Sequence, residues 1–229
     1  MFDCIFLKVV QERQQQMKHQ QMVSGVSFIS YWSGQLIADF IVSLPTCGLV
    51  IMMVHVFDVS AFEGSAEPVF IIVILLFLLS VLPLTYLLSL LFKSPEKAQA
   101  TFTAMYVLLG SVLAVVTYIL MVISKSTKRA SRVLAYLFRA SPMYCMADAL
   151  ILISFKPYLF PDLSYWDQKL TGRNLSAMAV ESVLYFALLL LVEYMASFPS
   201  LMTRLGFNVN VPKAVSGFFF FFYLYDRLS

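Results

Sequence analysis

Residues 68–92 read PVFIIVILLFLLSVLPLTYLLSLLF and contain no charged side chain. A transmembrane helix needs about 20 consecutive apolar residues, and as a helix this segment would extend about 37 Å. Residues 98–123, AQATFTAMYVLLGSVLAVVTYILMVI, are equally free of charge. Both segments are therefore predicted to cross a membrane as helices, with some tilt.

The composition of the whole chain is that of a membrane protein. Of its 229 residues, 60% are hydrophobic and 13% are charged, whereas soluble domains carry about 25% charged residues. The net charge is only +3, and the cations are scattered among apolar runs, so we expect no nucleic-acid partner. The chain is predicted to be an integral multi-pass membrane protein.

Two further apolar segments, residues 34–57 and 175–197, are long enough to span a membrane although each carries isolated charges. Residues 1–10 look like the end of another transmembrane helix. The predicted fold is therefore an all-α polytopic membrane protein with about five transmembrane helices, and its transmembrane domain covers residues 31–197.

The segment 133–155, VLAYLFRASPMYCMADALILISF, differs from the other apolar segments because Arg139 and Asp148 lie in its interior. A charge at the centre of a spanning helix costs about 2.5–3.5 kcal/mol, and a proline breaks a helix. We therefore predict two short helices with a break at Ser141-Pro142, folded into a re-entrant hairpin. Broken backbone is stable at membrane depth only where protein or water covers it.

Short loops set the expected orientation through the positive-inside rule. The loop 58–67 contains acids and no Lys or Arg, whereas the loop 93–97 and the polar segment 11–30 contain lysine and arginine. We therefore expect 11–30 and 93–97 in the cytosol and 58–67 outside. The segment 124–139 gives the opposite indication, because its five cations would lie outside in this arrangement. The two indications conflict.

Residues 11–22, QERQQQMKHQQM, form a predicted helix that is polar around nearly its whole circumference. An amphipathic interfacial helix is one interpretation, but this segment lacks the broad apolar face that such helices bury. A helix that is polar all round needs a partner, so we favour a cytosolic docking helix over residues 11–30. Gly25 would be the hinge at which the backbone turns from the interface into the membrane.

Isolated charges in apolar segments are candidate functional residues. Asp39 lies close to the change from polar to apolar sequence, so we expect it either to be partly solvated or to accept an interhelical bond from a Tyr or Gln. Glu181 lies deeper in its span and is the stronger candidate for a buried contact. With Arg139 and Asp148, these residues are the predicted polar contacts of a pathway or of helix interfaces.

No arrangement of residues for catalysis accompanies these charges. The two histidines and three cysteines have no metal-ligand spacing, and the patterns G-x-S-x-G and G-x-x-x-x-G-K-[ST] are absent from the sequence. The second pattern is the phosphate loop that binds ATP in P-loop ATPases. We therefore predict that the chain is not an enzyme and binds no cofactor or metal itself.

Four blocks of the sequence, taken in order, match a known pattern: ERQQQMKHQQMVSGVSFISYW (12–32), PLTYLLSLLFKSP (83–95), LFRASPMYC (137–145) and GRNLSAMAVES (172–182). Together they resemble the C-terminal transmembrane half of A-subfamily ABC transporters, the lipid exporters. The first block is similar to the family's coupling helix and following span, and the second to its fourth helix and short cytosolic loop. The third is similar to the re-entrant exit hairpin, and the fourth to the start of the sixth helix.

The resemblance implies a function and its partners. Residues 11–22 would be the coupling helix that rests on a nucleotide-binding domain, through Glu12, Arg13, Lys18, His19 and Gln20. The spanning helices would form one half of a lipid pathway beside a second transmembrane half. ATP and Mg would bind to the nucleotide-binding domain, and ATP hydrolysis there would move a phospholipid or sterol across the membrane.

Two positions and both ends of the chain depart from this family. Ser141 stands where the family has an aromatic residue, and Ser182 where it has Gly. The family's extracellular and nucleotide-binding domains have no counterpart here, and the atypical tail 198–229 resembles no part of it, so we expect a fragment or a truncated copy. A truncated paralogue that binds or regulates an intact transporter, or a non-functional remnant, is therefore the alternative to a transporting domain.

Overall fold

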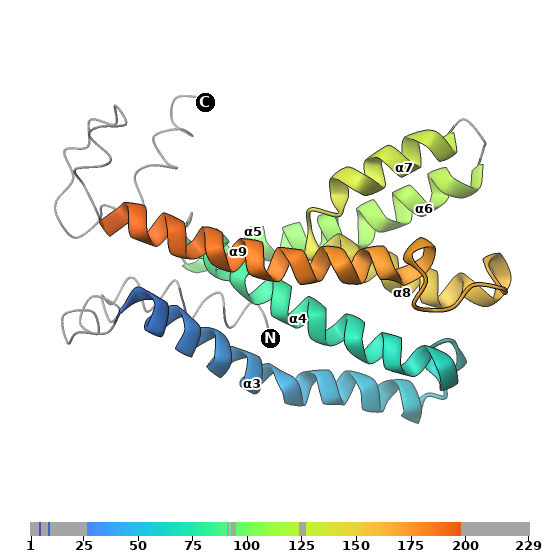
Figure 1. The fold of residues 1–229 in the computed structure, drawn as a ribbon, viewed down its shortest axis with the longest axis horizontal. Coiled ribbons are helices and arrows are strands. Elements are labelled where there is room, and N and C mark those ends of the chain that lie inside the picture. The colour runs from blue at the N-terminus through green and yellow to red at the C-terminus, as the bar shows by residue number, and fades with distance from the viewer. Residues whose placement is uncertain are drawn as a thin grey trace.

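The computed structural model describes residues 5, 9, 27–90, 92, 95–123 and 127–197. Within these ranges the chain consists of helices and turns, without a strand (Figure 1). The elements in order are α3 (Phe28–Val56), η1 (Ser60–Phe62), η2 (Gly64–Ala66), α4 (Glu67–Ser89), α5 (Pro95–Met105), η3 (Tyr106–Val112), α6 (Leu113–Ile123), α7 (Thr127–Phe138), α8 (Pro142–Leu159), η4 (Gln168–Gly172) and α9 (Arg173–Ser197).

Four stretches of this chain are long and apolar enough to cross a membrane: Phe28–Val56, Gly64–Ser89, Gln99–Leu120 and Gln168–Met195. They correspond to the four complete spans that the sequence predicts, so the all-α multi-pass fold is confirmed. The fifth predicted span, residues 1–10, lies outside the described residues apart from two isolated positions, and so does the tail 198–229.

The first of these helices begins earlier than the apolar run that predicted it. α3 starts at Phe28 rather than near residue 34, because Ser27 caps its N-terminus. The Ser27 hydroxyl accepts a hydrogen bond from the Ser30 N–H at 3.2 Å, which satisfies one of the backbone donors that a helix leaves unpaired in its first turn.

α4 is the central helix of the molecule and packs against α3, α8 and α9 (Figure 1). A helix that is apolar on all sides requires cover on all sides, and the side chains of α4 are buried around its circumference, as at Val69, Val73, Leu78 and Val81. Its buried hydroxyls bond to its own backbone; the Thr85 hydroxyl donates to the carbonyl of Val81 at 2.7 Å. α4 is thus the support on which the neighbouring helices are positioned.

The third apolar stretch is interrupted by one π-helical segment, η3, between α5 and α6. Within it the N–H of Leu113 bonds to the carbonyl of Leu108, five residues back, as in a π-helix. Gly110 in η3 is buried, and a Cβ placed on it would lie 3.6 Å from the carbonyl oxygen of Met143 at the start of α8. The glycine therefore permits a close approach between the middle of this span and the start of α8.

One end of the molecule gathers three of the chain's reversals. The α3–α4 connection, the Ile123 end of α6 with the Thr127 end of α7, and the α8–η4 connection all lie on the right in Figure 1. α7 therefore begins on the side of loop 58–67, and α5 (Pro95–Met105) begins toward the opposite end. α7 runs back along α6. The cytosolic location of the Pro95 end stays a prediction.

Candidate functional site

A three-residue turn, Arg139 to Ser141, separates α7 from α8. The helix break that the sequence predicts at Ser141-Pro142 lies at this turn. Ser141 has an extended backbone, with φ −119° and ψ 121°, as expected for the residue that precedes a proline. Pro142 lies in the first turn of α8, where its missing N–H costs no hydrogen bond. The two-helix hairpin therefore follows directly from the Ser-Pro pair.

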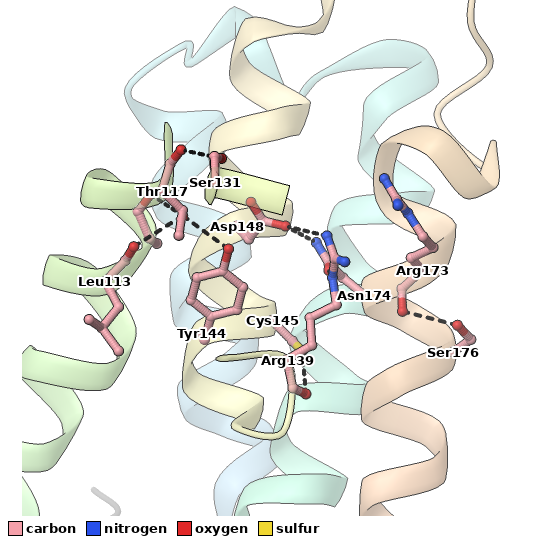
Figure 2. A network of polar contacts seen from close by, with 11 residues as sticks. Leu113, Thr117, Ser131, Arg139, Tyr144, Cys145, Asp148, Arg173, Asn174 and Ser176 are labelled. Atoms are coloured by element: carbon pink, nitrogen blue, oxygen red, sulfur yellow. Dashed lines mark hydrogen bonds and ion pairs between the residues drawn. The ribbon is translucent and has the colours of Figure 1, made fainter. Parts of the chain in front are cut away.

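Two of the predicted polar residues, Arg139 and Asp148, meet beside this turn (Figure 2). Arg139 Nη2 lies 3.5 Å from Asp148 Oδ2, and Arg139 Nε donates to Asn174 Oδ1 at 2.8 Å. Asn174 closes a triangle, because its Nδ2 donates to Asp148 Oδ2 at 2.8 Å. The three side chains come from the turn, α8 and α9, so this polar triangle fastens the hairpin to the last span.

The polar triangle is shielded from solvent. The side chains of Arg139 and Asp148 are 13% and 16% exposed, and Asn174 is 0% exposed. Removal of one member of such a buried ion pair leaves the other charge uncompensated, which costs about 3–5 kcal/mol. Asn174 is not among the site residues predicted from the sequence. The only feature of the sequence that could have indicated its role is an amide side chain in the first turn of a spanning helix.

A second set of polar contacts fixes the hairpin to α6 (Figure 2). The hydroxyls of Thr117 in α6 and Tyr144 in α8 lie 3.0 Å apart, and the Ser131 hydroxyl of α7 donates to the carbonyl of Thr117 at 2.8 Å. One threonine of the third span therefore contacts both arms of the hairpin.

The carbonyl groups of the turn also have partners. The Cys145 thiol donates to the carbonyl of Arg139 at 3.4 Å, and the Tyr185 hydroxyl of α9 donates to the carbonyl of Ala140. These bonds satisfy backbone acceptors that the broken helix leaves open. Ser141 differs, since its buried hydroxyl has no hydrogen-bond partner among the described residues.

Glu181 lies on the face of α9 that meets the hairpin. Asn174, Glu181 and Tyr185 are seven and four residues apart, which places them on one side of the helix. Glu181 is 6% exposed, and neither of its carboxylate oxygens has a hydrogen-bond partner among the described residues. It is close enough to Cys145 and Tyr185 to interact electrostatically with both. Glu181 is thus buried, and its role in a pathway or helix interface stays a prediction.

Asp39 belongs to a separate cluster between α3 and α4. It is 4% exposed, and its Oδ2 accepts hydrogen bonds from Tyr86 Oη at 2.7 Å and Gln35 Nε2 at 2.8 Å. The ring of Trp32 covers Tyr86, with their centroids 5.3 Å apart. Of the two predicted environments, the structure has the interhelical bond to a tyrosine, and aromatic rings cover the site.

The predicted docking residues lie outside the described residues: Glu12, Arg13, Lys18, His19 and Gln20, together with the hinge Gly25. Their roles therefore stay predictions. Within the described ranges no group of three or more His, Cys, Asp and Glu side chains is placed to hold a metal ion.

Comparison with known proteins places this architecture in a family. Residues 4–191 match the family model described as ABC-2 family transporter protein. The chain is 29% identical over 202 residues to the retinal-specific phospholipid-transporting ATPase ABCA4 of Bos taurus, which covers 82% of this chain and 9% of that protein. It is 27% identical over 203 residues to ATP-binding cassette sub-family A member 7 of Rattus norvegicus, covering 82% and 9%.

A nematode protein is a third relative. The chain is 27% identical over 191 residues to the ABC transporter ced-7 of Caenorhabditis elegans, covering 81% of this chain and 11% of that protein. The chain thus spans about a tenth of the length of the curated relatives that it matches. The match to the family model includes all four apolar stretches up to residue 191, the hairpin and the polar triangle. The chain therefore belongs to the ABC-2 family of transporter proteins, as a membrane-spanning part whose relatives are A-subfamily ABC transporters.

Proposed function

We propose that this chain forms one half of a lipid pathway through the membrane, driven by ATP that is hydrolysed on a separate nucleotide-binding domain. The observation that carries the proposal is the family match over residues 4–191, together with a relative that is named as a phospholipid-transporting ATPase. A second transmembrane half would complete the pathway, and ATP with Mg would bind to the nucleotide-binding domain rather than to this chain.

The hairpin α7–α8 is proposed to enter the membrane from the side of loop 58–67 and to turn back near mid-depth. Two contacts support this placement. Met143 packs on Gly110, near the middle of the apolar stretch Gln99–Leu120, and Ala140 accepts a bond from Tyr185, near the middle of Gln168–Met195. Non-helical backbone at this depth needs internal partners, and the partners of the turn carbonyls meet that need.

Movement would reach the hairpin through α3 and α4. The predicted docking helix directly precedes α3 in the sequence. α3 is joined to α4 by the buried bond between Asp39 and Tyr86, and α4 packs against α8 and α9. A displacement of the docking helix on its nucleotide-binding domain would therefore be passed to the two elements that hold the polar triangle.

The experiment that tests this function uses the gene product that carries the chain, purified together with its partners from its source membranes and reconstituted in liposomes. A lipid with a fluorescent headgroup reports leaflet exchange through its accessibility to dithionite. We expect ATP with Mg to speed the change in accessibility, and a non-hydrolysable ATP analogue to leave the rate at its basal value.

Two outcomes of this experiment would contradict the proposal. Lipid exchange that is equal with ATP and with the analogue would exclude ATP-driven transport. In a second outcome, the gene product carries no nucleotide-binding domain but co-purifies with an intact related transporter that is itself active. That result would support the alternative, in which this chain is a truncated paralogue that regulates another transporter.

A further inference from the structure

α7 has one face that packs against protein and one that does not. On the packed face, Ser131 is 7% exposed and bonds to Thr117 of α6, and the ring of Phe138 lies against Tyr144 of α8, with centroids 5.8 Å apart. On the opposite face, large apolar side chains are open, with exposed fractions of 66%, 63% and 68% for Val133, Tyr136 and Leu137. The exposed face therefore has no apolar cover within the described part of the chain.

Cations line one edge of this exposed face. Arg132 and Arg139 are seven residues apart, a spacing that places them on the same side of a helix. The segment 124–139 contains five cations and no acid. Arg132 is exposed, and the Arg139 guanidinium lies 5.5 Å from the centroid of the Tyr136 ring. The face thus combines an apolar strip with a basic edge.

The neighbours of α7 indicate what covers this face. α7 runs antiparallel to α6 (Figure 1), and the bond from Ser131 reaches Thr117, which lies inside the membrane-spanning stretch Gln99–Leu120. A helix that lies beside a spanning helix at this level presents its free face to lipid. Apolar side chains then meet acyl chains, and the cations require anions, which a phospholipid supplies in its phosphate group.

We propose that the exposed face of α7 is a binding site for a phospholipid, with Arg132 holding the headgroup phosphate. Val133, Tyr136 and Leu137 contact the glycerol backbone and the acyl chains. Arg139 marks the inner end of the site, because Asp148 and Asn174 already hold its guanidinium. The site rests on the proposed insertion of the hairpin into the membrane, and does not require ATP-driven transport.

The test measures lipid selectivity without ATP. The complete chain is reconstituted in phosphatidylcholine bilayers that contain spin-labelled phosphatidic acid or spin-labelled diacylglycerol, two lipids with the same chains that differ in the phosphate. Electron paramagnetic resonance gives the fraction of each lipid that is immobilised on the protein. We expect phosphatidic acid to be enriched over diacylglycerol, and the enrichment to fall about fivefold in Arg132→Gln.

The matched control is Lys169→Gln, which removes one exposed cation from η4. We expect it to keep the enrichment. Equal loss in Lys169→Gln and Arg132→Gln would overturn the site, because net charge alone would then explain selectivity. Unchanged selectivity in Arg132→Gln, with release of an acidic protein that co-purifies with the unaltered chain, would also overturn it and identify the face as a protein contact.

Arg132 is exposed, so its replacement is expected to leave the elution of the chain in gel filtration unchanged. The outcome is independent of the transport assay. Loss of phosphate selectivity with ATP-driven exchange intact would separate this site from the pathway, and selectivity without exchange would leave the site standing while the proposed function fails.

Discussion

The hydroxyl of Tyr86 donates a hydrogen bond of 2.7 Å to Oδ2 of Asp39, and this bond joins the first and second spanning helices at a buried point. Tyr86 is 0% exposed and Asp39 is 4% exposed, so water cannot replace the donor. The contact converts an isolated acid in an apolar helix into a specific attachment between α3 and α4.

Tyr86→Phe is therefore expected to lower the free energy of unfolding by about 1.5–3 kcal/mol, the typical contribution of a hydrogen bond to a charged group. Unfolding by SDS in mixed micelles, followed by circular dichroism, measures the change. Tyr158→Phe is the matched control, because Tyr158 is 83% exposed, and it should leave the transition where it was. Equal effects of the two substitutions would show that the phenol group at position 86 contributes nothing specific.

A double-mutant cycle tests the ion pair of the polar triangle. Arg139→Met alone strands Asp148, and Asp148→Leu alone strands Arg139, so each should destabilise the chain by about 3–5 kcal/mol. The combined variant buries no charge at either position and should recover part of that loss, as the SDS transition would reveal. The recovery is incomplete because Asn174, which is 0% exposed, loses both of its bonds in this variant. Additive losses in the double variant would mean that the two side chains are not coupled.

Gly172 is expected to tolerate no side chain. A Cβ at this position would lie 2.9 Å from the carbonyl oxygen of Trp166 and 3.1 Å from that of Asp167, so Gly172→Ala should destabilise the chain by about 1–3 kcal/mol. Gly48→Ala is the control, since nothing lies within 4 Å of a Cβ there and alanine favours a helix. A stabilising effect at both glycines would contradict the packing around η4.

The arrangement of the reversals predicts which residues share a side of the membrane. Single cysteines replacing Ala61 and Ile123 should react with a membrane-impermeant maleimide from one side, and a cysteine replacing Gln99 from the other. The background carries Cys4→Ser, and the native Cys47 and Cys145 are buried. Labelling of positions 99 and 123 from the same side would show that the apolar stretch Gln99–Leu120 does not cross the membrane.

Substitutions in the predicted docking helix should uncouple lipid transport from ATP hydrolysis without preventing the protein from folding. Glu12→Ala with Arg13→Ala, made in the full gene product, should abolish ATP-dependent lipid efflux while surface expression is kept, because the contact with the nucleotide-binding domain would be broken. A matched pair, Gln15→Ala with Gln16→Ala, changes residues outside the predicted contact. Unchanged efflux in the first pair would remove the basis for a coupling role.

The spans and the hairpin could be predicted because their signals are local. An uncharged run such as residues 68–92 has few alternatives to a spanning helix, and Pro142 breaks a helix wherever it occurs in one. The partner of Asp148 depends instead on how α8 and α9 pack, and nothing near Asn174 in the sequence indicates that its amide reaches a carboxylate 26 residues away. The same holds for Asp39, whose partner Tyr86 is 47 residues distant.

The π-helical segment η3 was also missed, for a different reason. Its residues, YVLLGSV, have the composition of any apolar helix, and its contact with α8, where Met143 approaches Gly110, has no signal in the local sequence. Local sequence thus predicts that the third span exists, but not where its helix becomes π-helical.

The hairpin turn is held through its peptide carbonyls, because the oxygens of Arg139 and Ala140 accept hydrogen bonds from Cys145 and Tyr185. An oxygen of the main chain is present whatever amino acid occupies the position. Inherited substitutions at Ala140, whose side chain is exposed, are therefore expected to be silent, whereas Tyr185→Phe, in a helix far along the chain, should loosen the same turn. In a comparison of sequence variants, the position that tolerates no substitution would thus be Tyr185, which lies 45 residues along the chain from the turn that it stabilises.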